Sequence, residues 1–591
     1  MSRLHAAGSC ATQSGDDPAT GQAVRTVSST GGTITKVYDK LGRLISYTDA
    51  DGGTTRTHYD LLDRPVRVTD SVPSTVTHTY DHTIDPRGLA TRTTDSVAGT
   101  VRATYDPDGK PRTEKLPGGY TVRETTNPDG SILERQYTRD SDGTVLYSDT
   151  VTENTHGQVV THAGWSSQHY RYDKLGRLTE VEDTTETICT PRTYTFDQRT
   201  NRTSLRTATG LPGDACPTSA GTTTSYTYDT ADRLTTSGHV YDAFGRTTAV
   251  PGHGTIAYHA NDLVHRQTAD GKRQTWTLDA AHRFRTWTVE TNTGGTWTQA
   301  ASKRNHYSGD GDNPSWIVEN TTTGEITRNV DSASGDLAAT TGASGDTVLQ
   351  VTNIHGDVAL QLPLTAGRAP VVLDHDEYGN PRTGQEPTRY GWLGAKQRSA
   401  ETLTGLTLMG VRLYNPHTGR FLSIDPVYGG GDNLYGYPGD PINQYDLDGR
   451  HWLFNKKNLS RLGTGLAVAG MFGCGLCAAG SAVISLGIAA HDWRSGKRRE
   501  AVIGGLTAFT WGAGRAASWG AKKYGKSISR KAPKGIPNRG RANKRARHRM
   551  AKKSARNYRV SRRVNRVDFG YGAIVAGRSV YGEYSSWRRR R

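Results

Sequence analysis

The sequence predicts a mainly β protein in which antiparallel hairpins curl into a shell, followed by a small, basic α-helical module. Three observations lead to this prediction: Tyr-Asp motifs recur along the first 450 residues, the composition is rich in glycine and threonine, and the character of the chain changes at Arg450. Hydrophobic residues make up only 34% of the chain, and glycine accounts for 69 of its 591 residues. Such a composition suits short strands and tight turns better than long helices.

The repeat unit is short and regular. Its first clear copies start at Tyr38, Tyr59, Tyr80 and Tyr105, which are 21, 21 and 25 residues apart. A period near twenty is typical of stacked repeats. In each unit an aspartate and a glycine supply a turn, and the arginine that follows begins the returning strand. Because one hairpin cannot bury its aromatic face alone, we expect the hairpins from about residue 30 to 446 to join into one curled sheet.

The repeats, and a later stretch above all, resemble the Rhs or YD-repeat proteins, whose relatives include teneurins and the shells of insecticidal toxin complexes. The later stretch is residues 375–426, which contains RYGWLG, TGL and RLYNPHTGRFLSIDP. It follows the pattern of the Rhs repeat-associated core almost position by position. The resemblance implies a β-cocoon that the core closes at one end, with a variable toxin domain after the core.

With this resemblance the chain divides into five regions. They are an N-terminal segment expected to be irregular (1–30), the repeat shell (31–370), the Rhs core (371–450), an apolar Gly/Ala-rich helical segment (451–521) and a basic C-terminal region that would be the effector (522–591). Residues 1–450 carry 42 basic and 53 acidic side chains, whereas residues 451–591 carry 32 and 4. The whole basic excess therefore lies after the core, which indicates a module with partners of its own.

The resemblance also implies self-cleavage at the end of the core. The family's two aspartates correspond to Asp425 and Asp446, which would cut the chain once, between Arg450 and His451. Two carboxyls held close together cannot both ionise easily, so that one can act as an acid while the other activates water. Arg420 could pair with one of these carboxyls or form a contact with the shell instead.

Some residues around this site depart from the family pattern. Leu447 stands where proline is usual, Arg450 where leucine is usual, and Asp440 where asparagine is usual. Asp448 adds a carboxylate that could take the role assigned to Asp446. The alternative interpretation is that these aspartates only shape turns in a glycine-rich loop.

Cys189 and Cys216 lie in polar, threonine- and proline-rich sequence. They could form a disulfide if the protein is exported, or remain two free thiols. The N-terminus shows no apolar core of the kind that a signal peptide needs. Secretion or a place at the cell surface is therefore expected from the resemblance, without a visible export signal.

The C-terminal region has two contrasting parts. Residues 462–490 contain no charged side chain, which allows either a membrane-active hairpin or a buried pair of helices. The basic run that follows would suit nucleic acid or an anionic membrane, or would be a cationic tail without a target. The candidate contact residues in this run are Lys544, Arg545, Arg547, Arg549, Lys552 and Lys553. No motif implies a metal or another cofactor.

We therefore expect a polymorphic-toxin delivery protein that acts in interbacterial competition and releases its effector by aspartyl self-cleavage, with a cognate immunity protein as partner. The alternative is a structural or adhesion protein of the cell surface that binds carbohydrate through its repeats and carries no toxin. A small immunity-like protein encoded immediately downstream would favour the first interpretation.

Overall fold

The computed structural model describes residues 4–5, 12–18, 20–128, 130–211, 216, 221–382, 384–427, 431 and 433–450. The chain divides into two compact units, Met1–Trp452 and Leu453–Arg591, and every described residue belongs to the first. The helical segment and the basic region expected over 451–591 therefore lie outside the described residues. Among the residues that are described, no helix is long and apolar enough to cross a membrane.

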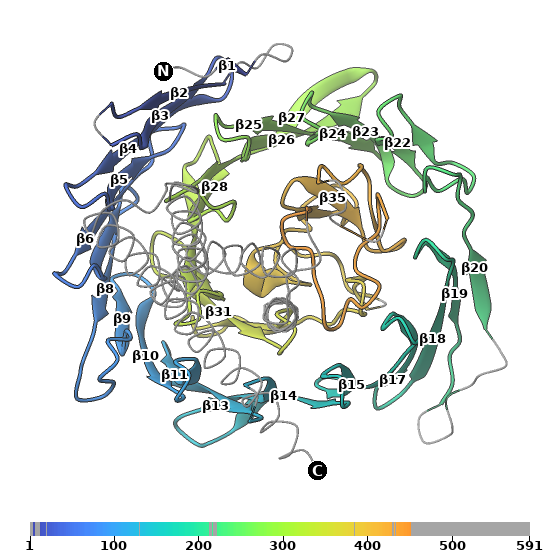
Figure 1. Ribbon diagram of the computed structural model, residues 1–591, viewed down its shortest axis with the longest axis horizontal. Helices are drawn as coiled ribbons and strands as arrows, with labels where there is room; N and C mark the ends of the chain where they lie inside the picture. Colours follow the sequence, from blue (N-terminus) through green and yellow to red (C-terminus); the bar gives the residue numbers. More distant parts are fainter. Residues whose placement is uncertain are drawn as a thin grey trace, which may run out of the picture. The chain divides into compact units, whose positions relative to one another are not determined.

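The first unit begins with a large antiparallel sheet, in which each strand pairs with its neighbours in the chain (Figure 1). In the described residues this sheet has 20 strands: β1 Leu4–His5, β2 Thr12–Asp16, β3 Ala23–Ser28, β4 Gly32–Tyr38, β5 Leu44–Thr48, β6 Thr54–Tyr59, β7 Pro65–Asp70, β8 Ser74–Thr79, β9 Arg92–Asp95, β10 Gly99–Tyr105, β11 Pro111–Leu116, β12 Tyr120–Thr126, β13 Ile132–Arg139, β14 Val145–Glu153, β15 Val159–Ala163, β16 Ser167–Tyr172, β17 Leu178–Thr184, β18 Cys189–Phe196, β19 Arg202–Thr207 and β20 Thr222–Ser225.

Two further antiparallel sheets follow. The second sheet has 13 described strands: β21 Val240–Tyr241, β22 Thr247–Val250, β23 Gly254–Tyr258, β24 Val264–Ala269, β25 Lys272–Leu278, β26 Phe284–Thr293, β27 Thr296–His306, β28 Trp316–Asn320, β29 Glu325–Asp331, β30 Leu337–Thr341, β31 Thr347–Thr352, β32 Val358–Pro363 and β33 Val371–Val372. The third sheet belongs to the core and consists of β34 Thr407–Met409, β35 Arg412–Asn415 and β36 Arg420–Phe421. The one helical element in the described part of the chain is the short 3-10 helix η1, Gly394–Lys396.

The Tyr-Asp motif builds a turn that also fastens one hairpin to the next. Asp39 accepts a hydrogen bond from the backbone N–H of Arg43 at 3.0 Å and pairs with the guanidinium of the same residue at 2.6 Å. Arg43 then donates to the carbonyl of Asp60 in the following hairpin, at 3.1 Å. The ring of Tyr59 lies 4.9 Å from the Arg43 guanidinium, and its hydroxyl donates to the carbonyl of Leu44. The same aspartate–arginine pair recurs at Asp60–Arg64, Asp173–Arg177, Asp229–Arg233, Asp242–Arg246 and Asp279–Arg283.

The residue before each of these arginines has a left-handed backbone conformation. Gly42 has a φ of 76°, and Asp63, which takes the same place in the next hairpin, has a φ of 60°. Glycine adopts this conformation without steric cost, and aspartate tolerates it better than most residues. The turn chemistry expected from the repeat is therefore what the structure shows.

The shell consists of two large sheets, so the expectation of one continuous sheet is wrong. Between β20 and β21 the only described pairing is an isolated bridge from Tyr228 to Leu234. The core supplies a partner where the second sheet begins, because the backbone N–H of Thr247 donates to the carbonyl of Leu422 at 2.8 Å. The core thus contacts β22, which also pairs with β21 and β23.

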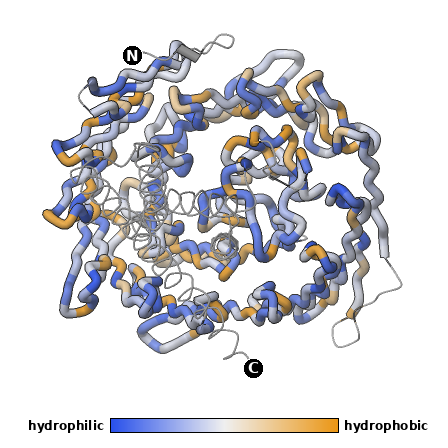
Figure 2. Tube along the Cα trace, in the orientation of Figure 1, coloured by the Kyte–Doolittle hydropathy of each residue, from blue (hydrophilic) through white to orange (hydrophobic). Residues whose placement is uncertain are grey.

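The two sheets bury their apolar faces against each other. Arg328 on β29 pairs with Asp95 on β9 at 2.9 Å, and the indole N–H of Trp316 donates to Asp70 on β7 at 3.1 Å. One hydrophobic cluster contains residues of both sheets, among them Val101, Leu116, Val122, Tyr137, Leu349 and Val351. Within this unit β28 and β31 lie inside the curve of β4–β14 (Figure 1), and apolar segments recur all along both sheets (Figure 2).

The described residues of the N-terminal segment, 12–18 and 20–30, form regular strands, whereas the sequence predicts an irregular segment. There β2 pairs antiparallel with β3, and β3 pairs with β4 of the first clear repeat. Gly21, with a φ of 70°, lies in the turn between β2 and β3. A preceding strand can extend an existing sheet edge through backbone hydrogen bonds alone, so a polar segment without a clear motif still forms strands here.

The core segment packs against both sheets. Its own hydrophobic cluster joins Trp392, Leu393, Met409, Tyr414, Phe421 and Tyr437. Towards the first sheet, Glu377 forms a buried ion pair with Arg192 at 2.8 Å. Towards the second sheet, the side chain of Asn329 donates to the hydroxyl of Tyr390 at 3.0 Å. These contacts attach the first part of the core to both sheets of the shell.

Candidate active site at the end of the core

The last described residues of the core run alongside the turn between β34 and β35. The backbone N–H of Val411 donates to the carbonyl of Asp448 at 3.1 Å. Two glycines make this close contact between backbones feasible. A Cβ on Gly410 would lie 2.3 Å from the Asp448 carbonyl oxygen, and a Cβ on Gly449 would lie 2.6 Å from the carbonyl oxygen of Met409. Both glycines also have positive φ angles, of 57° and 67°, which L side chains rarely adopt.

The two aspartates expected to cleave the chain meet at one arginine. The Nη2 atom of Arg412 lies 3.2 Å from Asp425 and 2.9 Å from Asp446. All three side chains are buried, with exposed fractions of 2%, 5% and 2%. Both carboxyls therefore contact the same nitrogen atom. The ring of Phe421 packs against the guanidinium, whose carbon lies 3.6 Å from the ring centroid.

Burial raises the pKa of Asp446 to about 6, although Arg412 opposes the shift, and the neighbouring Asp448 adds to it. One oxygen of Asp446 accepts a hydrogen bond from the backbone N–H of Arg450 at 3.0 Å, and Asp448 accepts from the same N–H at 3.0 Å. Burial also lowers the pKa of Arg412 below its ordinary value. A buried carboxyl that keeps a proton near pH 6 beside a second carboxyl is the pairing that general acid–base catalysis needs.

Arg420 lies at a different place in the unit. Its guanidinium donates to the side chain of Asn201 at 2.8 Å and to the carbonyl of Asp232, and it lies 4.7 Å from the ring centroid of Tyr228. These partners lie near the break between the two large sheets, so Arg420 connects the core to the shell. The arginine that contacts Asp425 and Asp446 is Arg412.

Sequence reasoning missed Arg412, although a signal for it exists. The four residues of β35 are all buried, and three of them are Leu413, Tyr414 and Asn415. A charged residue inside a buried strand requires ionic or hydrogen-bonding partners. Carboxylates in the same motif-rich segment are the obvious candidates.

The remaining candidate residues are placed as follows. Arg450 is exposed and is the last described residue, so His451 and the expected scissile bond lie outside the described part of the chain. The six basic candidates of the C-terminal region also lie outside it. Asp440 is buried away from Arg412, where it accepts hydrogen bonds from Gln158 at 3.1 Å and Asn443 at 2.9 Å. In the described residues, no group of three or more His, Cys, Asp or Glu side chains could hold a metal ion.

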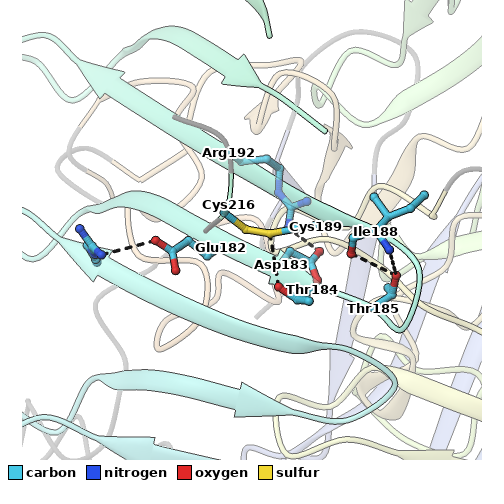
Figure 3. Close-up of a disulfide and its surroundings, with 9 residues drawn as sticks. Glu182, Asp183, Thr184, Thr185, Ile188, Cys189, Arg192 and Cys216 are labelled. Atoms are coloured by element: carbon cyan, nitrogen blue, oxygen red, sulfur yellow. Dashed lines mark hydrogen bonds and ion pairs between the residues drawn. A yellow bond between two sulfur atoms is a disulfide. The ribbon is translucent and has the colours of Figure 1, made fainter. Parts of the chain in front are cut away.

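Cys189 and Cys216 form a disulfide (Figure 3). Their Cα atoms lie 5.8 Å apart, within the usual range for a disulfide. The bond joins the start of β18 to the connection that leads to β20, and the hydroxyl of Thr184 donates to the Cys189 sulfur at 3.4 Å. The nearby Arg192 pairs with Asp183 on β17 at 2.8 Å (Figure 3).

Comparison with known sequences identifies the repeat. The family model described as RHS Repeat matches residues 38–77, which contain two of the Tyr-Asp turns. A stretch of 161 residues is 30% identical to the tRNA3(Ser)-specific nuclease WapA of Bacillus spizizenii. That stretch amounts to 25% of this chain and to 7% of WapA.

Comparison with solved structures identifies the fold. The crystal structure of TcdB2-TccC3-Cdc42 matches 74% of this chain with a TM-score of 0.60 at 17% sequence identity, and that of TcdB2-TccC3 without its hypervariable C-terminal region matches 74% with a TM-score of 0.59. The matched part is 25% of each of those chains, so this chain spans about a quarter of their length. The recurring Tyr-Asp turns, the antiparallel shell and these similarities together show that the chain contains Rhs/YD repeats and folds as a β-shell of this kind.

Proposed function

We propose that this chain is a toxin delivery protein of the polymorphic type, in which an Rhs shell carries a C-terminal effector and releases it by cutting the chain after Arg450. The observation that carries the proposal is the buried group of Asp425, Asp446 and Arg412, which lies directly beside the backbone N–H of Arg450. Asp446, with its raised pKa, is the acid, and Asp425 is the base that activates water.

The departures from the family pattern are compatible with this reaction. Leu447 contributes its carbonyl to the site, accepting a hydrogen bond from Arg398 at 2.9 Å, and a proline there would offer the same carbonyl. The side chain of Arg450 is exposed, so its size and charge are accommodated by solvent. Asp448 shares the Arg450 N–H with Asp446 but is itself exposed, which leaves Asp446 as the better candidate for the acid.

The effector would comprise residues 451–591, and we propose nucleic acid as its target. This region contains 32 basic and 4 acidic residues, and the WapA relatives are tRNA nucleases by name. Contacts from Lys544, Arg545, Arg547, Arg549, Lys552 and Lys553 to phosphates would make binding weaken steeply with salt. Membrane leakage by the isolated region, without nucleic-acid damage, would instead identify an anionic membrane as the target.

We further propose that the protein is secreted or displayed at the cell surface, and that the producing cell contains a cognate immunity protein. The structural relative TcdB2-TccC3 has a hypervariable C-terminal region, and the change in composition after Arg450 is what a variable effector behind a constant shell would produce. A cell that makes such an effector needs a protein that neutralises it. Expression of residues 451–591 alone in a bacterium, with growth and RNA integrity as readouts, tests this part of the proposal.

The cleavage itself is tested with the full chain on a denaturing gel. Wild-type protein should give a C-terminal fragment of 141 residues, whereas Asp425→Asn and Asp446→Asn should each run at the full 64.2 kDa. Asp440→Asn is the matched control, since Asp440 is a buried carboxyl of the same segment without contact to Arg412, and cleavage should persist. A wild-type chain that runs only at full length would show that these aspartates are structural.

A further inference from the structure

A loop of the second sheet, residues 307–315 between β27 and β28, is held by arginines from two directions. From the shell, Arg283 donates to the carbonyls of Gly309 and Gly311, the latter at 2.9 Å. From the core, Arg398 pairs with Asp312 at 2.8 Å and donates to the side chain of Asn313. The conformation of this loop therefore depends on the shell and on the core together.

Arg398 also contacts residues 446–450, the segment before the expected cut, here called the cleavage segment. The nitrogen that pairs with Asp312, Nη1, also donates to the carbonyl of Leu447 at 2.9 Å, and Nε donates to the carbonyl of Lys396 at 2.9 Å. Arg398 is buried, with an exposed fraction of 6%. One guanidinium thus connects a loop of the shell to the chain three residues before Arg450.

We propose that Arg398 is a positioning residue for self-cleavage, and that through it the β27–β28 loop acts as a checkpoint which permits cleavage only when the second sheet is folded against the core. The inference rests on the self-cleavage proposed above and adds to it a condition for the reaction. A chain whose second sheet is not folded would keep its effector attached.

The contacts of the cleavage segment give the physical reason. Three successive residues are held, Asp446 by Arg412, Leu447 by Arg398 and Asp448 by Val411. Intramolecular catalysis depends on the position of the reacting groups, and a displacement of about 1 Å can cost roughly 100-fold in rate. Loss of the middle contact leaves the outer two in place, so we expect slower cleavage and not its abolition.

The loop offers a matched pair of substitutions. Asp312 has an exposed fraction of 47% and pairs with Arg398, whereas Asp310 has one of 69% and pairs with Lys36 of the first sheet at 2.6 Å. In both pairs an exposed carboxylate meets a largely buried basic side chain, so removal of either charge should affect the stability of the shell to a similar extent. Only Asp312→Asn removes the ion pair between the loop and Arg398, whose hydrogen bond to the Asn313 side chain remains.

The experiment refolds the full chain from denaturant and follows the fraction cleaved over time on a denaturing gel. We expect Asp312→Asn to slow cleavage by about 10-fold and Arg398→Met by up to about 100-fold, while Asp310→Asn cleaves as fast as wild type. Arg398→Lys should restore part of the rate lost in Arg398→Met, because an ammonium can still donate to the Leu447 carbonyl. Denaturant unfolding of each variant checks that the shell is equally stable.

The outcomes separate this inference from the proposed function. If wild type is not cleaved, the proposed self-cleavage fails. If wild type is cleaved and both Asp312→Asn and Arg398→Met match its rate, only the checkpoint is overturned. Two results would overturn the role of Arg398. One is a loss of cleavage rate in Asp310→Asn equal to that in Asp312→Asn, and the other is an Arg398→Lys variant that cleaves no faster than Arg398→Met. Either result would mean that the substitutions slow cleavage only by destabilising the loop.

Discussion

The close contact at Gly410 gives a sharp test of the geometry of the cleavage segment. In Gly410→Ala the new Cβ would lie 2.3 Å from the carbonyl oxygen of Asp448 and 2.5 Å from its Cα. Real Cβ atoms essentially never approach other heavy atoms closer than 3.0 Å. The backbone of Asp448 must therefore move away by most of an ångström, together with Gly449 and Arg450.

The expected effect on the rate follows from that displacement. A shift of about 1 Å in the substrate segment lowers an intramolecular rate by roughly 100-fold. Alanine at a φ of 57° also costs about 1 kcal/mol of backbone strain, because of its Cβ. Gly367→Ala is the matched control, since Gly367 has a φ of 84° and its Cβ would meet nothing within 4 Å. It imposes comparable backbone strain without the clash.

The assay is the time course of cleavage after refolding, with the denaturant midpoint of each variant measured in parallel. Gly410→Ala should be cleaved about 100-fold more slowly than Gly367→Ala, although both lose a similar amount of stability from strain. Equal cleavage rates in the two variants would refute the idea that the segment beside the β34–β35 turn is the substrate of the reaction.

Two further predictions concern pH and the disulfide. Because the pKa of Asp446 is raised from 3.8 to about 6 in the folded state, the cleavage rate should fall about tenfold per pH unit above about pH 6 if Asp446 is the acid, and a rate that rises with pH would assign it as the base. The raised pKa also makes the free energy of unfolding fall as the pH rises, because protonation of Asp446 favours the folded state. This contribution is complete below about pH 4 and is lost as the pH rises through about 6. Denaturant unfolding of wild type and of Asp446→Asn at several pH values should show the difference. Cys189→Ser opens a bond that joins residues 27 apart, which should lower the free energy of unfolding by about 3–4 kcal/mol. A reductant should have the same effect on wild type and none on Cys189→Ser.

The shell was largely predictable from the sequence because its hairpins are specified locally. The aspartate, the left-handed residue and the arginine of each turn lie within five positions of one another, as in Asp39–Arg43. The period of the tyrosines then fixes which hairpins are neighbours. For these reasons both the antiparallel pairing and its order follow from the chain itself.

The break between the two sheets could not be predicted in the same way. The core contacts the shell beside this break, as from Thr247 to Leu422, residues 175 positions apart in the sequence, and no local pattern encodes such a contact. The role of Arg412 was hidden for a related reason. Arg412 and Arg420 both lie in the core motif, and only the fold determines that the first contacts Asp425 and Asp446 while the second contacts Asn201.

The contacts of the cleavage segment imply that the proposed self-cleavage would occur only once in each chain. Arg398, Val411 and Arg412 hold residues on the N-terminal side of the expected cut, and Asp446 is itself part of that segment. Cleavage after Arg450 removes none of these partners, so the new C-terminus of the shell would stay where it lies in the uncut chain. An intramolecular substrate has an effective concentration far above that of any free peptide, and a product held in the same way excludes a second substrate. A catalytic site built from its own substrate strand is therefore limited to one turnover by its structure.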